Sequence, residues 1–305
     1  MASHLQALVM LANSLLLTTA VIWGLGFVAQ VLGMNYLSPF AFIGTRFLLG
    51  AASLMPLVAF FYYRNLLPQS SLRTVLIGSL VLGVILFAAG SLQQVGIVYS
   101  NASNAGFITG LYMVLVPLIG LAFRHRPGLN AWLGTVLALV GLFLLSVKAD
   151  FSMGYGDSLL LIGAVGWALH ILAIDHFASR AAPLLLALGQ FIVCGVLAVG
   201  VSVVWETTTW DQMRAATNVL IYAGVITVGV AYTLQVIAQE RADPTHAAII
   251  LSLEAVFGAI GGYLFLQEQL TSRELWGCTL MLAGMLVSQV SWRDFVALFS
   301  VRPSA

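Results

Sequence analysis

Two long stretches of this sequence contain no strongly charged side chain. No Asp, Glu, Lys or Arg occurs from Ala2 to Thr45 or from Thr74 to Phe123. A helix needs roughly 20 apolar residues to cross about 30 Å of hydrocarbon, so each stretch is long enough for two crossings. Because lipid cannot satisfy backbone hydrogen bonds, segments inside it fold as α-helices or as closed β-barrels. The uninterrupted apolar runs favour helices and predict an all-α integral membrane protein.

The composition excludes several other classes. Hydrophobic residues make up 61% of the chain and charged residues 8%, whereas soluble domains carry about a quarter charged residues. The basic residues are isolated or paired, so no patch is expected to bind nucleic acid. Cys194 and Cys278 lie in apolar runs, and the five histidines are dispersed, which predicts no disulfide, no metal site and no cofactor.

Pro, Gly and charged residues between the apolar stretches divide the chain into ten expected spans with short connections. The first span is not interpreted as a signal peptide, because no Lys or Arg precedes it and its apolar stretch is too long. No connection is large enough for a soluble domain, so any site is expected inside the membrane region. The expected spans are 8–32, 38–62, 73–97, 103–123, 129–148, 157–177, 182–205, 215–238, 245–266 and 273–292.

The loop charges predict an orientation. If the N-terminus is inside, the inner segments hold eight Lys or Arg residues and the outer loops hold three. Positive residues are enriched on the cytoplasmic side of membrane proteins. Both termini are therefore predicted to be cytoplasmic in a bacterial inner membrane, with residues 296–305 forming a cytoplasmic tail.

The two halves of the sequence resemble one another. An offset of 144 residues places Trp23 on Trp167, Pro39 on Pro183 and Phe47 on Phe191. Offsets of 142 or 143 place Gln93 on Gln235, Ala105 on Ala247, Gly134 on Gly277 and Gly141 on Gly284. Each half, 1–150 and 151–295, holds five spans, and this odd number inserts the second half in the opposite sense. The expected fold is two inverted five-helix repeats around a central cavity, an arrangement typical of secondary transporters.

Several runs carry a family resemblance that extends over about residues 15–292. These runs are 23–27 (Trp-Gly-Leu-Gly-Phe), 46–50 (Arg-Phe-Leu-Leu-Gly), 103–107 (Ser-Asn-Ala-Gly-Phe), 244–254, 262–271 and 277–284. Together they resemble the EamA family of the drug/metabolite transporter superfamily. The resemblance implies a ten-helix fold with a central cavity, and an exporter or permease of metabolites such as amino acids.

Polar residues recur on single faces of the expected spans. Trp23 and Gln30 are seven residues apart, Trp167 and His170 three apart, and Tyr232 and Gln235 three apart, spacings that place each pair on one helical face. Polar side chains inside a membrane usually face a cavity or the bundle interior, and they also bond helices to one another. The convergent set favours a pocket. The predicted substrate-binding residues are Trp23, Gln30, Gln94, Tyr112, Trp167, His170, Tyr232 and Gln235.

Two charges inside the spans have open roles. Arg46 lies about one third of the way into the second span, where a charge is costly unless it finds a partner. It either braces the bundle or meets an anionic substrate group. Glu254 either forms a structural hydrogen bond or binds and releases a coupling proton.

The combined interpretation is a secondary transporter, and no catalytic role is expected for any residue. The expected partners are a small organic substrate, the lipid bilayer and protons as a coupling ion, and the assembly is a monomer or a homodimer. A membrane sensor, or an intramembrane enzyme without a recognisable motif, is the alternative. The absence of Walker, His-Glu-x-x-His and Gly-x-Ser-x-Gly motifs argues against an enzyme.

Overall fold

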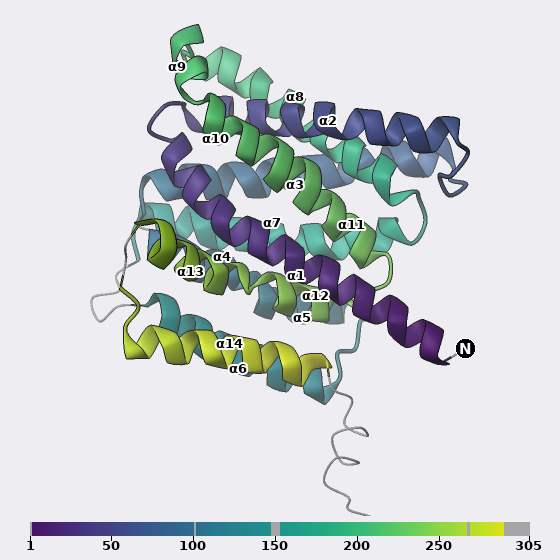
Figure 1. Ribbon diagram of the computed structural model, residues 1–305, viewed down its shortest axis with the longest axis vertical. Coiled ribbons are helices and arrows are strands. Elements are labelled where there is room, and N and C mark those ends of the chain that lie inside the picture. The colour runs from purple at the N-terminus through teal and green to yellow at the C-terminus, as the bar shows by residue number, and fades with distance from the viewer. Residues whose placement is uncertain (1, 101, 148–152, 267–268, 290–305) are drawn as a thin grey trace, which may run out of the picture.

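The structure is a computed structural model that describes residues 2–100, 102–147, 153–266 and 269–289. Within these ranges the chain is helical and has no strand. Figure 1 shows the long helices side by side in one bundle, with the N-terminal end of α1 at one edge. The helices are α1 (Ala2–Gly33), α2 (Pro39–Tyr63), α3 (Leu72–Val98), α4 (Ala102–Gly110), α5 (Tyr112–Ala122), α6 (Leu129–Ser146), α7 (Tyr155–Ala178), α8 (Pro183–Trp205), α9 (Trp210–Ala215), α10 (Thr217–Ile221), the π-helix η1 (Tyr222–Tyr232), α11 (Thr233–Gln239), α12 (Pro244–Leu251), α13 (Glu254–Leu266) and α14 (Ser272–Gln289).

In the described part of the chain, nine segments are long and apolar enough to cross a membrane, which confirms a multi-pass helical membrane protein. They are Ala7–Gly33, Pro39–Tyr63, Leu72–Val98, Ala105–Ala122, Leu129–Ser146, Tyr155–Ala178, Pro183–Trp205, Thr217–Gln239 and Pro244–Gly261. The tenth expected span, 273–292, corresponds to α14, which is not among the nine. Arg273, Glu274 and Gln289 lie within the 18 described residues of α14 and make it more polar than the others. Residues 290–292 and the expected tail 296–305 lie outside the described residues.

The second and eighth helices begin in the same way. Pro39 opens α2 and Pro183 opens α8, and the residue before each proline has an extended backbone, as expected for proline in the first turn of a helix. Side chains from other segments satisfy the backbone N–H groups at both starts. Glu206 accepts hydrogen bonds from Phe40 N at 3.0 Å and Ala41 N at 2.8 Å, whereas Ser70 Oγ accepts one from Ala182 N at 2.8 Å.

The fourth and ninth spans are each broken near their middle, where the sequence predicted continuous helices. The first break lies at Leu111, between α4 and α5, and the second lies at 252–253, between α12 and α13. At both breaks the backbone forms a 3₁₀-type hydrogen bond between residues three apart in the sequence. Val114 N donates to Leu111 O at 2.9 Å, and Ala255 N donates to Ser252 O at 3.2 Å. Broken spans at matching positions of two halves mark the binding site in many transporters.

The eighth span also departs from a plain α-helix. Its central 11 residues form the π-helix η1, whereas its counterpart in the first half, α3, is α-helical throughout. π-Helical turns are rare and occur frequently at functional sites.

The packing of α6 against α14 depends on four glycines. A Cβ atom at Gly134 would lie 2.6 Å from Gly284 O, and one at Gly141 would lie 2.6 Å from Gly277 O. The pairing runs forward along α6 and backward along α14, so the two helices are antiparallel. The pair lies along one edge of the bundle in Figure 1.

Contacts between the halves are reciprocal. In the first half, α3 packs on α7 and α8; in the second half, the eighth span packs on α1 and α2. The ring of Phe47 contacts that of Phe191, its counterpart at an offset of 144, with centroids 6.2 Å apart. Two residues at corresponding sequence positions of the halves are therefore in contact.

Candidate functional site

A small pocket lies between the two halves at the level of the helix breaks. Its free volume is about 40 Å³, room for a few water molecules and less than the ~300 Å³ typical of a metabolite site. It is lined by Trp23, Gly26, Phe27, Gln30, Arg46, Gln93, Thr109, Tyr112, Trp167, Ile171, Thr227, Tyr232, Gln235, Leu251 and Glu254.

Aromatic rings from both halves form one wall of this pocket. Tyr232, at the end of η1, lies with its ring centroid 4.5 Å from that of Trp23 and 6.3 Å from that of Trp167. The ring of Phe47 packs behind Tyr232 at 5.7 Å. Two tryptophans at equivalent positions of the repeat therefore flank a single tyrosine, and together they offer apolar and cation-binding faces to a ligand.

Hydrogen bonds connect three of the helices around the pocket. Trp167 Nε1 donates to Gln93 Oε1 at 2.6 Å, and Gln93 Nε2 donates to Gln30 Oε1 at 3.2 Å, so one chain of bonds joins α7, α3 and α1. On the opposite side, Trp23 Nε1 donates to Thr227 O in η1 at 3.2 Å. Two equivalent tryptophans thus have different partners, because the π-helix presents a backbone carbonyl to Trp23.

The pocket contains two ionisable groups of opposite sign. Tyr112 Oη donates a hydrogen bond to Glu254 Oε1 at 3.2 Å. These two residues begin α5 and α13 directly after the helix breaks, and they are counterparts at an offset of 142. Arg46, from α2, lies over the rings of Phe42 and Phe47, with its Cζ 5.3 and 5.2 Å from the two centroids.

Three buried polar atoms of the lining have no hydrogen-bond partner within the described protein: Arg46 Nε, Thr109 Oγ1 and Gln235 Oε1. A buried polar atom without a partner costs about 1–3 kcal/mol, and most such atoms in proteins are paired. Seven other buried side-chain atoms of the described residues, among them Gln94 Oε1 and His170 Nδ1, also lack a partner. The three in the lining are the ones that water or a polar ligand in this pocket can reach.

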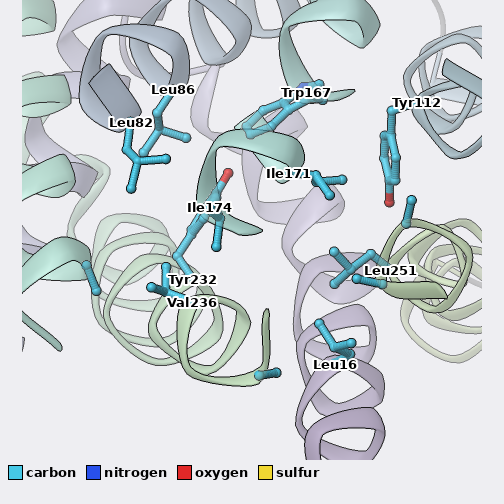
Figure 2. Close-up of a cluster of buried hydrophobic side chains, with 14 of the residues drawn as sticks. Leu16, Leu82, Leu86, Tyr112, Trp167, Ile171, Ile174, Tyr232, Val236 and Leu251 are labelled. Atoms are coloured by element: carbon cyan, nitrogen blue, oxygen red, sulfur yellow. The ribbon is translucent and has the colours of Figure 1, made fainter. Parts of the chain in front are cut away.

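An apolar cluster and two separate hollows surround the pocket. The buried side chains of Leu16, Leu82, Leu86, Ile174 and Val236 belong to the same cluster as the pocket residues Ile171 and Leu251 (Figure 2). Near the α1–α2 connection (34–38), a hollow of about 490 Å³ is lined by Val31, Met34, Ile97 and other residues. Near the α5–α6 connection (123–128), a hollow of about 420 Å³ is lined by Phe123, His125, Asp175 and other residues. Neither hollow shares a lining residue with the pocket, although neighbouring positions of the same helices line them.

Eight of the ten residues that the sequence singled out line this pocket: Trp23, Gln30, Arg46, Tyr112, Trp167, Tyr232, Gln235 and Glu254. Gln94 and His170 lie beside it but not among its lining residues. Gln94 is fully buried, with its Nε2 3.5 Å from Gln30 O, and His170 Nε2 lies 2.8 Å from Gln190 Oε1.

Sequence reasoning missed several lining residues. Gln93 lines the pocket where Gln94 was predicted, and the two differ only by the rotation of α3, which the sequence does not specify. Thr109 and Thr227 carried a signal as polar residues inside spans, whereas Gly26, Ile171 and Leu251 carried none. Among the described residues, no group of three or more His, Cys, Asp or Glu side chains could hold a metal ion.

The sequence model of the EamA-like transporter family matches this chain twice, at residues 10–147 and again at 154–289. The chain belongs to the EamA-like transporter family. The two matches cover its two halves in turn, and the members of this family are transporters, not enzymes.

Individual relatives agree with this assignment. The chain is 29% identical over 269 residues to an uncharacterized transporter of Archaeoglobus fulgidus, covering 88% of this chain and 82% of the relative. It is 27% identical over 184 residues to the threonine/homoserine exporter RhtA of Escherichia coli, covering 57% of this chain and 59% of that protein. A solved crystal structure of a protein matches with a TM-score of 0.75 at 18% identity, covering 93% of this chain and 98% of the other, a likeness of fold alone.

Proposed function

We propose that this EamA-family protein is a secondary transporter that moves small organic metabolites by alternating access, with amino acids or aromatic amphiphiles as substrates. The observation that carries the proposal is the pocket between the broken spans, where three buried polar atoms lack partners. The name of the relative RhtA, a threonine/homoserine exporter, supports amino acids.

Alternating access follows from an inverted repeat of two five-helix units, 1–150 and 151–295. The antiparallel α6 and α14, the reciprocal helix contacts and the breaks at matching positions support this arrangement. In such a fold, the contacts of one half can exchange with those of the other, so that the pocket opens to each side in turn.

The orientation expected from the loop charges gives each hollow a side. With both termini cytoplasmic in a bacterial inner membrane, the hollow near the α1–α2 connection faces outward and the hollow near the α5–α6 connection faces the cytoplasm. The small free volume of the pocket between them corresponds to a narrowed state that must widen to admit a metabolite. The transporter is proposed to act as a monomer or a homodimer.

Transport by the purified chain in lipid vesicles tests the proposal. Vesicles are loaded with one radiolabelled L-amino acid at a time, and efflux is measured against protein-free vesicles. Saturable flux or exchange is the expected result. An absence of flux across all amino acids and a set of aromatic amines would refute the proposed transport of these substrates and favour a membrane sensor.

Glu254 is proposed to bind the coupling proton, because its carboxyl group lies in the pocket with Tyr112 as its partner. Glu254→Gln should abolish flux driven by a pH gradient while leaving exchange of substrate for substrate. Tyr112→Phe is the matched control, since it removes the hydrogen bond and keeps the carboxyl group. Equal pH-driven flux in Glu254→Gln and the unmodified protein would assign Glu254 a structural role.

A further inference from the structure

We infer that the transported substrate carries a carboxylate group and that Arg46 binds it. This inference rests on the proposed function, since it names the substrate class of the same pocket. It gives Arg46 the role of an anion receptor, whereas the sequence alone leaves open whether Arg46 braces the bundle or binds an anion.

The position of Arg46 makes its charge accessible through the pocket. Arg46 follows Pro39 by two helical turns, so it lies about 10 Å into α2 from the α1–α2 connection. Its side chain is only 5% exposed, and it contributes to the pocket lining. A small anion that enters the pocket therefore meets the guanidinium.

Arg46 lacks the partners that a structural arginine would have. No hydrogen bond or ion pair joins it to any described residue, and its Nε is buried without an acceptor. Its close neighbours are the ring faces of Phe42 and Phe47. Glu254 is hydrogen-bonded to Tyr112 and lies beyond ion-pair distance from Arg46. A buried guanidinium without an anion is unfavourable, and its planar fork of donors matches a carboxylate.

The second half of the chain shows that helix packing at this position does not require a cation. The counterpart of Arg46, at the offset of 144 that relates Phe47 to Phe191, is Gln190 on α8. Gln190 is fully buried and hydrogen-bonded to His170 at 2.8 Å. Gln190 Nε2, like Arg46 Nε, has no partner among the described residues. The two positions therefore differ in charge, with a neutral side chain that makes one hydrogen bond in one half and a cation that makes none in the other.

The other groups of the pocket narrow the ligand class. Gln235 Oε1 lacks a donor and Glu254 carries carboxyl oxygens, so both accept hydrogen bonds. The rings of Trp23 and Tyr232 offer faces that attract ammonium groups. A molecule with a carboxylate for Arg46 and an ammonium group for these acceptors is a zwitterionic amino acid. A phosphate would bring a second negative charge, and Arg46 is the only arginine or lysine among the pocket-lining residues.

Paired ligands test this inference on the purified full chain in detergent. Each common L-amino acid is compared with its own C-terminal amide, which keeps the shape and removes the negative charge. The readouts are a ligand-induced rise in unfolding temperature and the dissociation constant from tryptophan fluorescence. At least one amino acid should bind, and its amide should bind about 10- to 100-fold more weakly, the range expected for losing a hydrogen-bonded charge pair.

Variants then locate the effect. Arg46→Gln should weaken binding of the amino acid to the level of its amide. Arg46→Lys should restore part of the loss, because lysine returns the positive charge without the paired N–H donors of the guanidinium. Arg64→Gln is the control, because Arg64 lies at the exposed end of the same helix and also stacks on a phenylalanine, Phe60. The comparison of acid with amide needs no variant, so it remains decisive if Arg46→Gln does not fold.

Three results overturn the inference: acids and amides that bind equally, ligands confined to amines or phosphate esters, or unchanged affinity in Arg46→Gln. Binding that depends on Arg46 without any flux in vesicles would support the carboxylate site and overturn the transporter proposal. Flux that does not depend on Arg46 would support the transporter proposal and overturn the carboxylate site.

Discussion

The glycine contacts between α6 and α14 give a prediction whose size follows from the structure. A Cβ atom at Gly141 would lie 2.6 Å from Gly277 O and 2.7 Å from Met281 N, whereas ordinary contacts begin at about 3.4 Å. The helices would have to separate by about 0.8 Å locally, because both neighbouring atoms belong to backbone and cannot rotate away. Overpacking of this kind typically costs ~1–3 kcal/mol.

Gly141→Ala should therefore lower the unfolding temperature in detergent by ~2–10 °C. Gly277→Ala should have a similar effect, since its Cβ would lie 2.7 Å from Gly141 O. The double variant should lose less than the sum of the two, because the first substitution has already moved the helices apart.

The control is Gly90→Ala, a buried position in α3 where a Cβ atom meets no other atom within 4 Å. It should leave the unfolding temperature unchanged or raise it, because alanine loses less backbone entropy than glycine on folding. If Gly141→Ala behaves like Gly90→Ala, the close backbone contact between α6 and α14 is not a stabilising feature, and the reasoning fails.

Three further predictions concern the pocket and its surroundings. In intact vesicles with a known orientation, Gln30→Cys should react with an impermeant thiol reagent from outside, whereas Gln239→Cys, at a buried position, should not. Substrate that turns the transporter inward should reverse this pattern. Unchanged reactivity at both positions would contradict gating. Trp167→Phe should destabilise the protein by ~1–3 kcal/mol in thermal unfolding, because it leaves the buried Gln93 oxygen without its donor, and a neutral result would mean that another donor replaces it. Glu206→Gln should lower stability by ~0.5–2 kcal/mol in thermal unfolding by weakening the two charge-assisted bonds at the start of α2, and an unchanged stability would mean that the amide side chain replaces both bonds.

The sequence predicted the spans well because the cost of burying charge in lipid restricts where they can lie. Nine of the expected spans correspond to membrane-length helices within a few residues. The tenth has no counterpart among these helices, since Arg273 and Glu274 make α14 more polar than the others. Charge-free length constrains only the presence of a helix, so it could not reveal the breaks at Leu111 and 252–253 or the π-helix η1, whose apolar sequences also suit regular helices.

The pocket was predictable to the extent that polar residues in lipid must face something polar. That rule located Arg46, Glu254 and the aromatic residues, but it does not distinguish a pocket from a buried hydrogen bond. His170 was predicted to bind substrate, but its ring nitrogen lies at hydrogen-bond distance from Gln190 on α8 instead. The sequence does not indicate which side chains of two different helices will meet. The choice between Gln93 and Gln94 depends on about 100° of helix rotation, which packing against α7 and α8 determines.

The contact between Tyr112 and Glu254 also shows what the proposed pair of five-helix units gains from lying in one polypeptide. In a pair of identical five-helix chains, every side chain at the symmetry axis faces its own copy, so an acid there would oppose a second acid. Within one chain the two positions can differ, and a single acid then faces a phenol. The same freedom allows a guanidinium at Arg46 where the other half has the neutral Gln190. A single chain with two matching halves can therefore offer an asymmetric molecule an asymmetric receptor.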